Sequence, residues 1–178
     1  GIYKGNTVYI SGPSHAEEVA MGKLTGLIAA CENPKNTIIF RELMRVPGLL
    51  AYSSLDVIGV QICAAVKNVI AVVYGCCDAI SETSDTFGDN SESLLLAAGL
   101  NEIQQFGFAM GATHAETFTS IAGVGDLDVT CKSKYGRNRR FGQDIIKNNI
   151  LAKFKNLDDL IEHINEIGYL PEGAVACK

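Results

Sequence analysis

A lysine stands at the centre of the longest apolar stretch of this sequence. Between residues 57 and 73 the only polar side chains are those of Gln61, Lys67 and Asn68. A stretch of this length that is apolar on every side is typical of a helix buried inside its domain. We therefore expect a buried helix over residues 57–75. A buried ammonium group is costly in free energy unless another group pairs with it or the protein uses it.

Three interpretations of Lys67 follow from this pattern. Alanines one helical turn from Lys67 and Asn68 would leave room for a ligand beside these two polar side chains. Alternatively, Lys67 lies at the edge of the core and extends its ammonium group into water. A membrane-spanning segment is the third interpretation, and a charge and an amide at its centre argue against it.

Composition and net charge indicate which broad class of protein this chain belongs to. The chain has 178 residues, of which 47% are apolar and 20% charged, as is typical of a soluble globular protein. A net charge of −5 argues against a general nucleic-acid-binding protein. Six cysteines and three histidines show no zinc-site spacing, so we expect no metal. We interpret the cysteines as reduced core residues, which indicates a cytoplasmic protein.

The first 54 residues alternate strands with helices. The candidate strands are residues 7–11, 24–30 and 49–53, and helices begin near His15 and Pro34. Three strands are too few for a separate sheet domain of ordinary size. We therefore expect residues 1–54 to be the terminal α/β part of a larger cofactor-binding domain, the earlier part of which is missing from this chain.

A glycine-containing turn follows the first strand. Free backbone N–H groups between Gly12 and Ala16, at the start of the short helix, could bind an anion. The alternative is that the Gly12-Pro13 pair only marks a turn.

Residues 55–178 are predicted to be mainly helical. Helices are expected over residues 57–75, 92–110, 113–121, 138–147 and 157–167, with a polar acidic loop at 81–90. Thr113 and Glu116 have capping-box spacing, and Gly99 and Gly107 indicate close helix packing. Residues 123–126 are predicted to form a loop. Asp126 at its end either caps a helix or places its carboxylate against Lys67.

Basic residues gather in one short segment of this acidic chain. The five residues are Lys132, Lys134, Arg137, Arg139 and Arg140. The planar guanidinium group of arginine binds phosphate through two hydrogen bonds, so the segment is a candidate phosphate site. A basic face exposed to water and a nucleic-acid-binding patch are the alternatives.

Five short motifs together resemble the NAD(P)-dependent glycerol-3-phosphate dehydrogenase family. They occur in the family's order and cover nearly the whole chain: Ser11-Gly12-Pro13-Ser14, Ile58-Gly59-Val60-Gln61, Ala65-Val66-Lys67-Asn68-Val69-Ile70-Ala71, Gly123-Val124-Gly125-Asp126-Leu127 and Arg137-Asn138-Arg139-Arg140-Phe141-Gly142. The resemblance implies the C-terminal, substrate-binding part of such an enzyme. It implies a mainly α fold, in which a helical domain like the C-terminal domain of 6-phosphogluconate dehydrogenase (residues 55–178) follows a small α/β remnant of a Rossmann-type domain.

The resemblance also implies roles for individual residues. Lys67 matches the family's catalytic lysine, which gives or takes a proton at the substrate oxygen, and Asn68 and Asp126 match residues of the same polar site. The residues matched to substrate binding are Gly12, Ser14, Thr130, Arg137 and Asn138. The residues matched to cofactor contact are Ala16, Arg137, Leu170 and Glu172.

The implied ligands and partners come from the same resemblance. They are NAD or NADP, with most of the cofactor site in the missing N-terminal domain, and glycerol 3-phosphate or dihydroxyacetone phosphate as substrate. A homodimer without a membrane span or nucleic-acid partner is expected, in glycerol-3-phosphate metabolism and phospholipid biosynthesis. The alternatives are a non-catalytic module for phosphate binding and dimerisation, and a related dehydrogenase for another hydroxy acid. We expect this chain alone to be inactive.

The sequence departs from the family pattern at a few positions. Glu92 and Ala98 stand where the family has basic residues, and Gly136 replaces a larger residue before Arg137. The loop at residues 81–89 is longer than in the family. These departures concern the rim of the implied phosphate site more than its centre.

Overall fold

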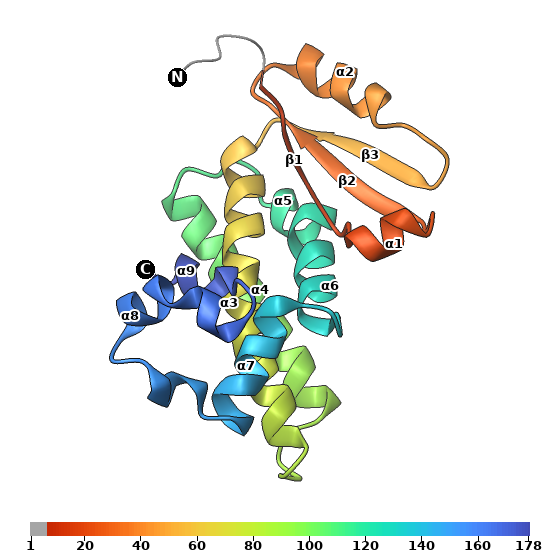
Figure 1. The fold of residues 1–178 in the computed structure, drawn as a ribbon. Coiled ribbons are helices and arrows are strands. Elements are labelled where there is room, and N and C mark those ends of the chain that lie inside the picture. Colours follow the sequence, from red (N-terminus) through yellow and green to blue (C-terminus); the bar gives the residue numbers. More distant parts are fainter. Residues whose placement is uncertain (1–6) are drawn as a thin grey trace. The chain divides into compact units, whose positions relative to one another are not determined.

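The structure, a computed structural model, describes residues 7–178. Residues 1–6 of the predicted α/β segment lie outside the described residues. The chain divides into two compact units, of which the first contains the residues up to Ala64 and Ile103–Asp126. The second contains Ala65–Glu102 and Leu127–Lys178. Figure 1 shows the small sheet and the many helices that make up the chain.

A three-stranded sheet belongs to the first unit. Its strands lie in the order β1 (Tyr9–Ser11), β2 (Thr25–Ala30), β3 (Leu49–Ser54). β1 pairs with β2 in antiparallel orientation, with Tyr9 opposite Ala30, and β2 pairs with β3 in parallel, with Thr25 opposite Leu49. The three predicted strands are confirmed. Central strand β2 is the most deeply buried of the three, as its apolar sequence indicates.

Two helices accompany the sheet. The short α1 (Ala16–Ala20) is exposed to solvent, and α2 (Pro34–Leu43) packs against β2 and β3 (Figure 1). α2 begins as predicted, because the Asn33 side chain accepts a hydrogen bond from the Lys35 N–H at 3.0 Å and Pro34 occupies the first turn. The core of this unit contains Ile28, Ala30, Val60 and Ala122.

The remaining elements are helical. They are α3 (Val57–Ser81), α4 (Asp89–Ala109), α5 (Glu116–Thr119), a π-helix (Ile121–Gly125), α6 (Asp126–Lys132), α7 (Arg137–Lys147), a 3₁₀ helix (Ile150–Lys153), α8 (Leu157–Glu162), a second 3₁₀ helix (Ile164–Ile167) and α9 (Glu172–Ala176). The predicted mainly α fold is confirmed. The single helix predicted over residues 157–167 is instead α8 and a 3₁₀ helix, with Asn156 capping its start at 2.9 Å and Gly168 ending it at φ 77°.

The prediction that α3 is buried on all sides is wrong. α3 runs six residues past Gly75 to Ser81, and Ile58 and Val73 on it are 41% and 42% exposed. Apolar composition shows which side chains can be buried, but neighbouring elements decide which of them are covered. Among residues 7–178, α3 is the one helix long and apolar enough to cross a membrane, and 33% of that window is buried. Core helices of water-soluble proteins share these properties.

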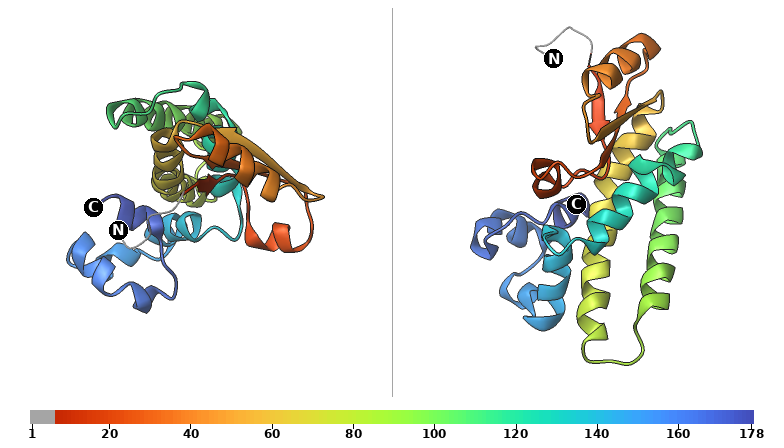
Figure 2. Two further views of the ribbon diagram at one scale, coloured as in Figure 1. Left: turned by 90° about the horizontal axis from the view of Figure 1, so that it is seen from above. Right: turned by 90° about the vertical axis from the view of Figure 1, so that its right-hand side faces the viewer.

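α4 lies antiparallel to α3, and residues 82–88 join the two helices (Figure 2). Glycines on α4 allow close packing, as predicted. A Cβ on Gly99 would come within 2.8 Å of Ile70 Cγ2, and one on Gly107 would overlap the ring of Phe118. In the second unit a separate core contains Phe141, Ile150, Leu160 and Ala174.

The capping box predicted at Thr113 is wrong. Ala115 precedes α5 and makes no side-chain cap. The carboxylate of Asp56 instead accepts hydrogen bonds from the backbone N–H groups of Thr113 and His114, at 3.1 and 3.3 Å. The acceptor for these N–H groups is thus a carboxylate 57 residues away in the sequence, and not a side chain of the predicted capping box.

The loop predicted at residues 123–126 is also wrong. Residues 121–125 form the π-helix, and α6 follows it directly at Asp126. Gly123 permits this conformation, because a Cβ there would lie 2.6 Å from the Cα of Phe118. Single π-turns next to α-helices are frequent at functional sites.

The cysteines are only partly core residues. Cys31, Cys63 and Cys131 are buried, and Cys76 and Cys77 are half-buried. Cys177 is exposed, because it follows the short terminal helix α9. All six, which lie within the described residues, are free thiols.

Candidate active site

The residues predicted to form the site are divided between the two compact units. Gly12, Ser14, Ala16 and Asp126 belong to the first unit. Lys67, Asn68, Thr130, Arg137, Asn138, Leu170 and Glu172 belong to the second.

In the first unit, the turn after β1 has a backbone that requires glycine. Gly12 has φ 137°, and a Cβ there would lie 2.7 Å from the carbonyl oxygen of Gly26. The Ser14 hydroxyl donates to the carbonyl oxygen of Gly12 at 3.2 Å and stabilises the turn. Ala16 is exposed at the start of α1.

The carboxylate of Asp126 lies against the end of β1. Asp126 is 2% exposed, and the Ser11 hydroxyl donates to its Oδ2 at 3.4 Å. Burial raises the pKa of Tyr9, and the negative charge of Asp126 raises it further. A buried carboxylate therefore lies one residue from the glycine turn. It can accept a hydrogen bond or compensate a nearby cation.

In the second unit, Asn138 joins three helices in a buried network. Its Nδ2 donates to Asn68 Oδ1 on α3 at 3.0 Å and to Glu172 Oε2 on α9 at 3.3 Å. Its Oδ1 accepts from the Gly173 N–H at 2.7 Å. Asn138 is 5% exposed, so these bonds satisfy polar groups that water barely reaches. Four of the predicted residues (Asn68, Arg137, Asn138 and Glu172) are thus brought together.

Arg137 is on the more exposed side of this network. Its Nη2 donates to Glu172 Oε1 at 2.5 Å, while its side chain remains 52% exposed and that of Glu172 35% exposed. A guanidinium group has five N–H donors in a planar fork. An exposed guanidinium with one carboxylate neighbour retains donors that can bind a phosphate.

Lys67 precedes Asn68 on α3 and is half-buried. Burial and, to a smaller extent, the negative charge of Asp128 raise the pKa of the Cys131 thiol to about 12, whereas the positive charges of Arg139, Lys132 and Lys67 act against this shift. The ammonium group therefore lies within electrostatic range of α6. The hydroxyl-bearing residue next to Cys131 is Thr130, which is 9% exposed.

The basic segment at residues 132–140 does not form one phosphate patch. Lys132 pairs with Asp128 at 2.7 Å, and Arg139 pairs with Asp78 at 2.9 Å. Arg140 lies over the ring of Tyr169, with 5.2 Å from its Cζ to the ring centroid. Arg137 is the member of the segment that joins the network around Asn138.

Two acidic residues were not identified from the sequence. Asp56 is 2% exposed and accepts four hydrogen bonds, and Asp78 holds Arg139. Asp56 directly precedes a long apolar helix, which is a recognisable N-cap signal. Asp78 had no comparable signal, because its partner lies 61 residues away.

Three of the residues matched to cofactor contact carry groups that could hold part of a dinucleotide. In the second unit, Arg137 offers a cation, Glu172 a carboxylate acceptor for hydroxyl groups, and Leu170 an apolar side chain that is 42% exposed. These are the chemical groups that a ribose phosphate and a planar ring require. Among the described residues, no group of three His, Cys, Asp or Glu side chains could hold a metal ion.

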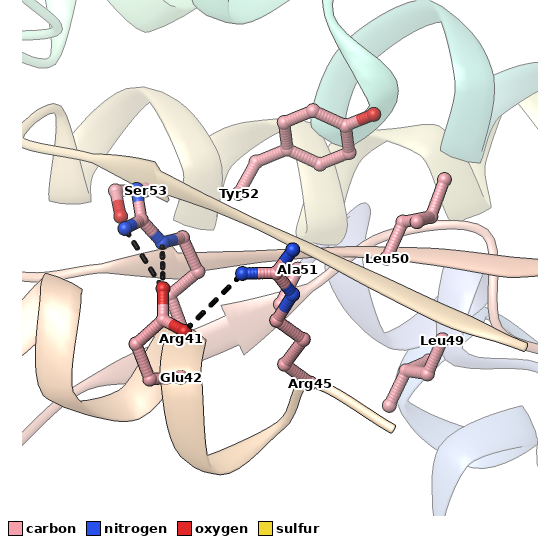
Figure 3. Close-up of a pocket in the computed structure, with 8 residues that line it drawn as sticks. All are labelled: Arg41, Glu42, Arg45, Leu49, Leu50, Ala51, Tyr52 and Ser53. Atoms are coloured by element: carbon pink, nitrogen blue, oxygen red, sulfur yellow. Dashed lines mark hydrogen bonds and ion pairs between the residues drawn. The ribbon is translucent and has the colours of Figure 1, made fainter. Parts of the chain in front are cut away.

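A pocket in the first unit lies apart from the predicted residues. It has a volume of about 520 Å³ and lies between α2 and β3 (Figure 3). Arg41 and Arg45 at its rim both pair with Glu42, at 2.9 and 3.5 Å. No residue assigned to substrate or cofactor lines it.

Comparisons with known proteins agree with the motifs. A family model described as the C-terminus of NAD-dependent glycerol-3-phosphate dehydrogenase matches residues 56–178, and the corresponding N-terminus model matches residues 1–37. A glycerol-3-phosphate dehydrogenase [NAD(P)+] of Treponema denticola is 70% identical over 99% of this chain and 50% of its own length. That of Treponema pallidum (strain Nichols) is 64% identical over 97% of this chain and 49% of its own length.

Solved structures give the same answer. The crystal structure of glycerol-3-phosphate dehydrogenase from Coxiella burnetii has a TM-score of 0.78 and 32% identity, and the match covers 95% of this chain and 47% of that one. The chain thus spans about half the length of the curated relatives it matches. Since the C-terminal family model covers more than half of these 178 residues, the chain belongs to the NAD-dependent glycerol-3-phosphate dehydrogenase family.

Proposed function

We propose that this chain supplies the proton-transferring lysine and the phosphate-binding residues of an enzyme that interconverts sn-glycerol 3-phosphate and dihydroxyacetone phosphate with NAD or NADP. The observation that carries the proposal is the network around Asn138. It gathers a half-exposed guanidinium group and two amide side chains in a member of this family, and one of these amides, that of Asn68, follows Lys67 on α3. Cationic and amide donors in one place are suited to a small phosphorylated substrate.

The substrate phosphate would be bound by Arg137, Asn138 and Thr130. Arg137 contributes the charge and the planar fork, and Thr130 contributes a hydroxyl donor. Asn138 would exchange its hydrogen bond to Glu172 for one to the phosphate. Anchoring the phosphate holds the rest of the substrate in a fixed orientation, which lowers the entropic part of the barrier. Gly12 and Ser14 are also proposed to bind substrate, because they belong to a motif that resembles the family's.

Lys67 would act as the proton donor and acceptor. When the carbonyl group of dihydroxyacetone phosphate is reduced, negative charge develops on its oxygen. A protonated Lys67 stabilises that charge and donates the proton, and neutral Lys67 accepts it in the reverse direction. A bound nicotinamide supplies or accepts the hydride. Asn68 would orient the oxygen through its amide. Asp126 is proposed as a further residue of the polar site on the strength of its motif.

Arg137, Leu170 and Glu172, together with Ala16, are proposed to contact the cofactor. Arg137 serves both ligands in this scheme, because its five donors exceed what one phosphate uses. Either NAD or NADP is compatible with these four residues.

We also propose that residues 1–54 belong to the cofactor-binding domain and residues 55–178 to the helical substrate-binding domain of the larger enzyme, in the cytoplasm. A homodimer is proposed because large apolar side chains are exposed on α3 and α4, among them Val73, Phe106 and Phe108 at 42%, 48% and 43%. Exposed apolar side chains are available to be covered by a second subunit.

The test is Lys67→Met in the full-length enzyme that contains this chain. We expect kcat with dihydroxyacetone phosphate to fall by about 10²-fold or more, the usual contribution of a general acid. Binding of the phosphorylated substrate should be retained, because methionine leaves the phosphate-binding residues in place. Lys35→Met, at an exposed position on α2, is the matched control and should leave turnover unchanged.

Near-normal turnover of the Lys67→Met enzyme would exclude Lys67 from the mechanism. Turnover of ketopantoate or 6-phosphogluconate in place of dihydroxyacetone phosphate would indicate a dehydrogenase for another hydroxy acid. Binding of the phosphorylated substrate without any turnover in the full-length protein would indicate a non-catalytic phosphate-binding module.

A further inference from the structure

Arg139 forms a second polar network in the same unit, two residues after Arg137 on α7. Its Nη2 and Nε atoms both donate to Asp78 Oδ2 on α3, at 2.9 and 3.2 Å. Both side chains are only 18% exposed, and the centroid of the Tyr74 ring lies 5.8 Å from Arg139 Cζ. Gln143 also donates to Asp78 Oδ2. Because water is largely kept from this pair, it is held more firmly than a surface ion pair.

The remaining side of the Arg139 guanidinium reaches the segment before α7. Its Nη1 donates to the carbonyl oxygen of Lys132, the last residue of α6, at 2.8 Å. Residues 133–136 connect α6 to α7, so this hydrogen bond joins the two ends of that loop. Such a link removes conformations that the loop would otherwise sample.

The residues proposed to bind phosphate flank this same loop. Thr130 lies two residues before Lys132, and Arg137 and Asn138 are the first two residues of α7. Any movement of residues 133–136 therefore changes the distance between the hydroxyl group on one side and the guanidinium and amide groups on the other.

The packing of α7 on α3 does not depend on the Arg139 side chain. The backbones of the two helices meet at two glycines: a Cβ on Gly142 would lie 2.8 Å from the Cys76 nitrogen, and one on Gly75 would lie 3.0 Å from the Arg139 Cα. The buried cluster around Phe141 adds to this contact. These contacts hold the two helices together without the ion pair, so the ion pair can have another role.

We propose that Arg139, fixed by Asp78, is a positioning residue for the substrate phosphate. It holds the loop of residues 133–136 so that Thr130, Arg137 and Asn138 present their donors in one geometry. This inference rests on the proposed function. A looser loop binds the phosphate less tightly, but a phosphate that is bound still anchors the substrate, so KM rises while kcat is nearly unchanged.

The test is Arg139→Lys in the full-length enzyme. Lysine keeps a positive charge for Asp78, but its single ammonium group cannot also reproduce the fork that reaches the Lys132 carbonyl oxygen. We expect KM for dihydroxyacetone phosphate to rise about tenfold, which corresponds to the loss of one charge-assisted hydrogen bond. The value of kcat should change by less than about twofold, as uniform binding predicts.

Arg140→Lys is the matched control, because Arg140 lies over Tyr169 and has no hydrogen bond to Asp78 or Lys132 among the described contacts. Its KM should stay unchanged.

Amide hydrogen exchange separates positioning from simple stability. Exchange should accelerate within residues 133–136 in Arg139→Lys and stay unchanged along the rest of α7 and α3. If Arg139→Lys folds poorly, Gln143→Met, which removes one donor to Asp78, should give the same pattern more weakly. Unchanged KM with unchanged loop exchange would overturn the inference, and so would faster exchange throughout both helices. A wild-type enzyme that does not turn over dihydroxyacetone phosphate would refute the proposed function, whereas the exchange of the loop would still report on Arg139.

Discussion

Asp56 carries a carboxylate that is almost entirely removed from water. Burial alone would raise the pKa of this group, but the hydrogen bonds from Thr117, Gly59, Thr113 and His114 together outweigh it, and the pKa lies below the ordinary value. The shortest of these hydrogen bonds is that from the Thr117 hydroxyl, at 2.8 Å. One side chain thereby caps the start of α3 and fixes the backbone before α5.

This lowered pKa predicts a pH dependence of stability. Because the folded pKa lies below the unfolded value of about 3.9, the unfolded state binds the proton more readily, and the stabilisation is complete above about pH 5 and is lost as the pH falls below 4. Asp56→Asn should lower the free energy of unfolding by about 1–3 kcal/mol at pH 7 and by clearly less at pH 3. Urea unfolding at both pH values measures this. The exposed Asp158→Asn is the control, and an equal loss at both pH values would contradict the assignment.

Asn138 is a second residue whose side chain is held by hydrogen bonds, because each of its polar atoms has a defined partner. Asn138→Asp keeps the acceptor for the Gly173 N–H but removes both donors and places a second carboxylate beside Glu172. We expect a loss of about 1–3 kcal/mol in the free energy of unfolding, since a buried donor set is removed. Thermal or urea unfolding tests it, with the exposed Asn165→Asp as control. Equal stability of the two variants would show that the network contributes little.

Among the elements, the crossing of α3 and α7 depends on the absence of side chains. A Cβ on Gly142 would overlap the carbonyl oxygen of Val72 as well as approach the Cys76 nitrogen. At such a contact no rotamer change can relieve the overlap, so the helices have to move apart.

Gly142→Ala should therefore destabilise the protein by about 1–3 kcal/mol, the usual effect of overpacking. Gly88→Ala is the matched control: no atom lies within 4 Å of a Cβ there and its φ is not in the left-handed region. It should be neutral or stabilise by about 0.4–1 kcal/mol through the unfolded state. Chemical denaturation of both variants gives the comparison, and similar stabilities would contradict the role of the crossing.

The π-helix is an element that sequence patterns did not predict, as are α6, α9 and the 3₁₀ helix Ile150–Lys153. Asp126 follows it immediately, so the extra backbone turn decides the direction in which α6 begins. A Gly-Val-Gly-Asp segment is typical of a loop, and here the contact of Gly123 with Phe118 converts it into a helix.

At the scale of the whole molecule, the proposed site residues are shared between two compact units in a chain that spans about half the length of its relatives. We therefore expect the 178-residue chain alone to show no oxidation of NADH or NADPH in the presence of dihydroxyacetone phosphate. The decrease in absorbance of the reduced cofactor measures this, with the full-length enzyme as positive control. Turnover by the isolated chain at a rate comparable with the full-length enzyme would contradict the expectation.

Much of the fold follows from local patterns along the chain. Alternating apolar residues and the Gly and Pro positions predicted the three strands, α2 and the long helices, because each depends on neighbours within a few residues. The five motifs identified the family. Four residues to which the resemblance gave separate roles are joined by one hydrogen-bond network: Asn68, Arg137, Asn138 and Glu172. The roles of these residues in binding and catalysis stay predictions.

Several features that local patterns did not predict depend on partners that are distant in the sequence. Asp56, 57 residues away in the sequence, accepts the hydrogen bond from the Thr113 N–H in place of a local capping box. Asp78, 61 residues away, pairs with Arg139, which was expected to belong to a phosphate site. The exposed side of α3 likewise depends on which elements cover it. A helix or strand can be inferred from the order of its own residues, but the partner of a buried charge is set by the packing of segments that the chain brings together on folding.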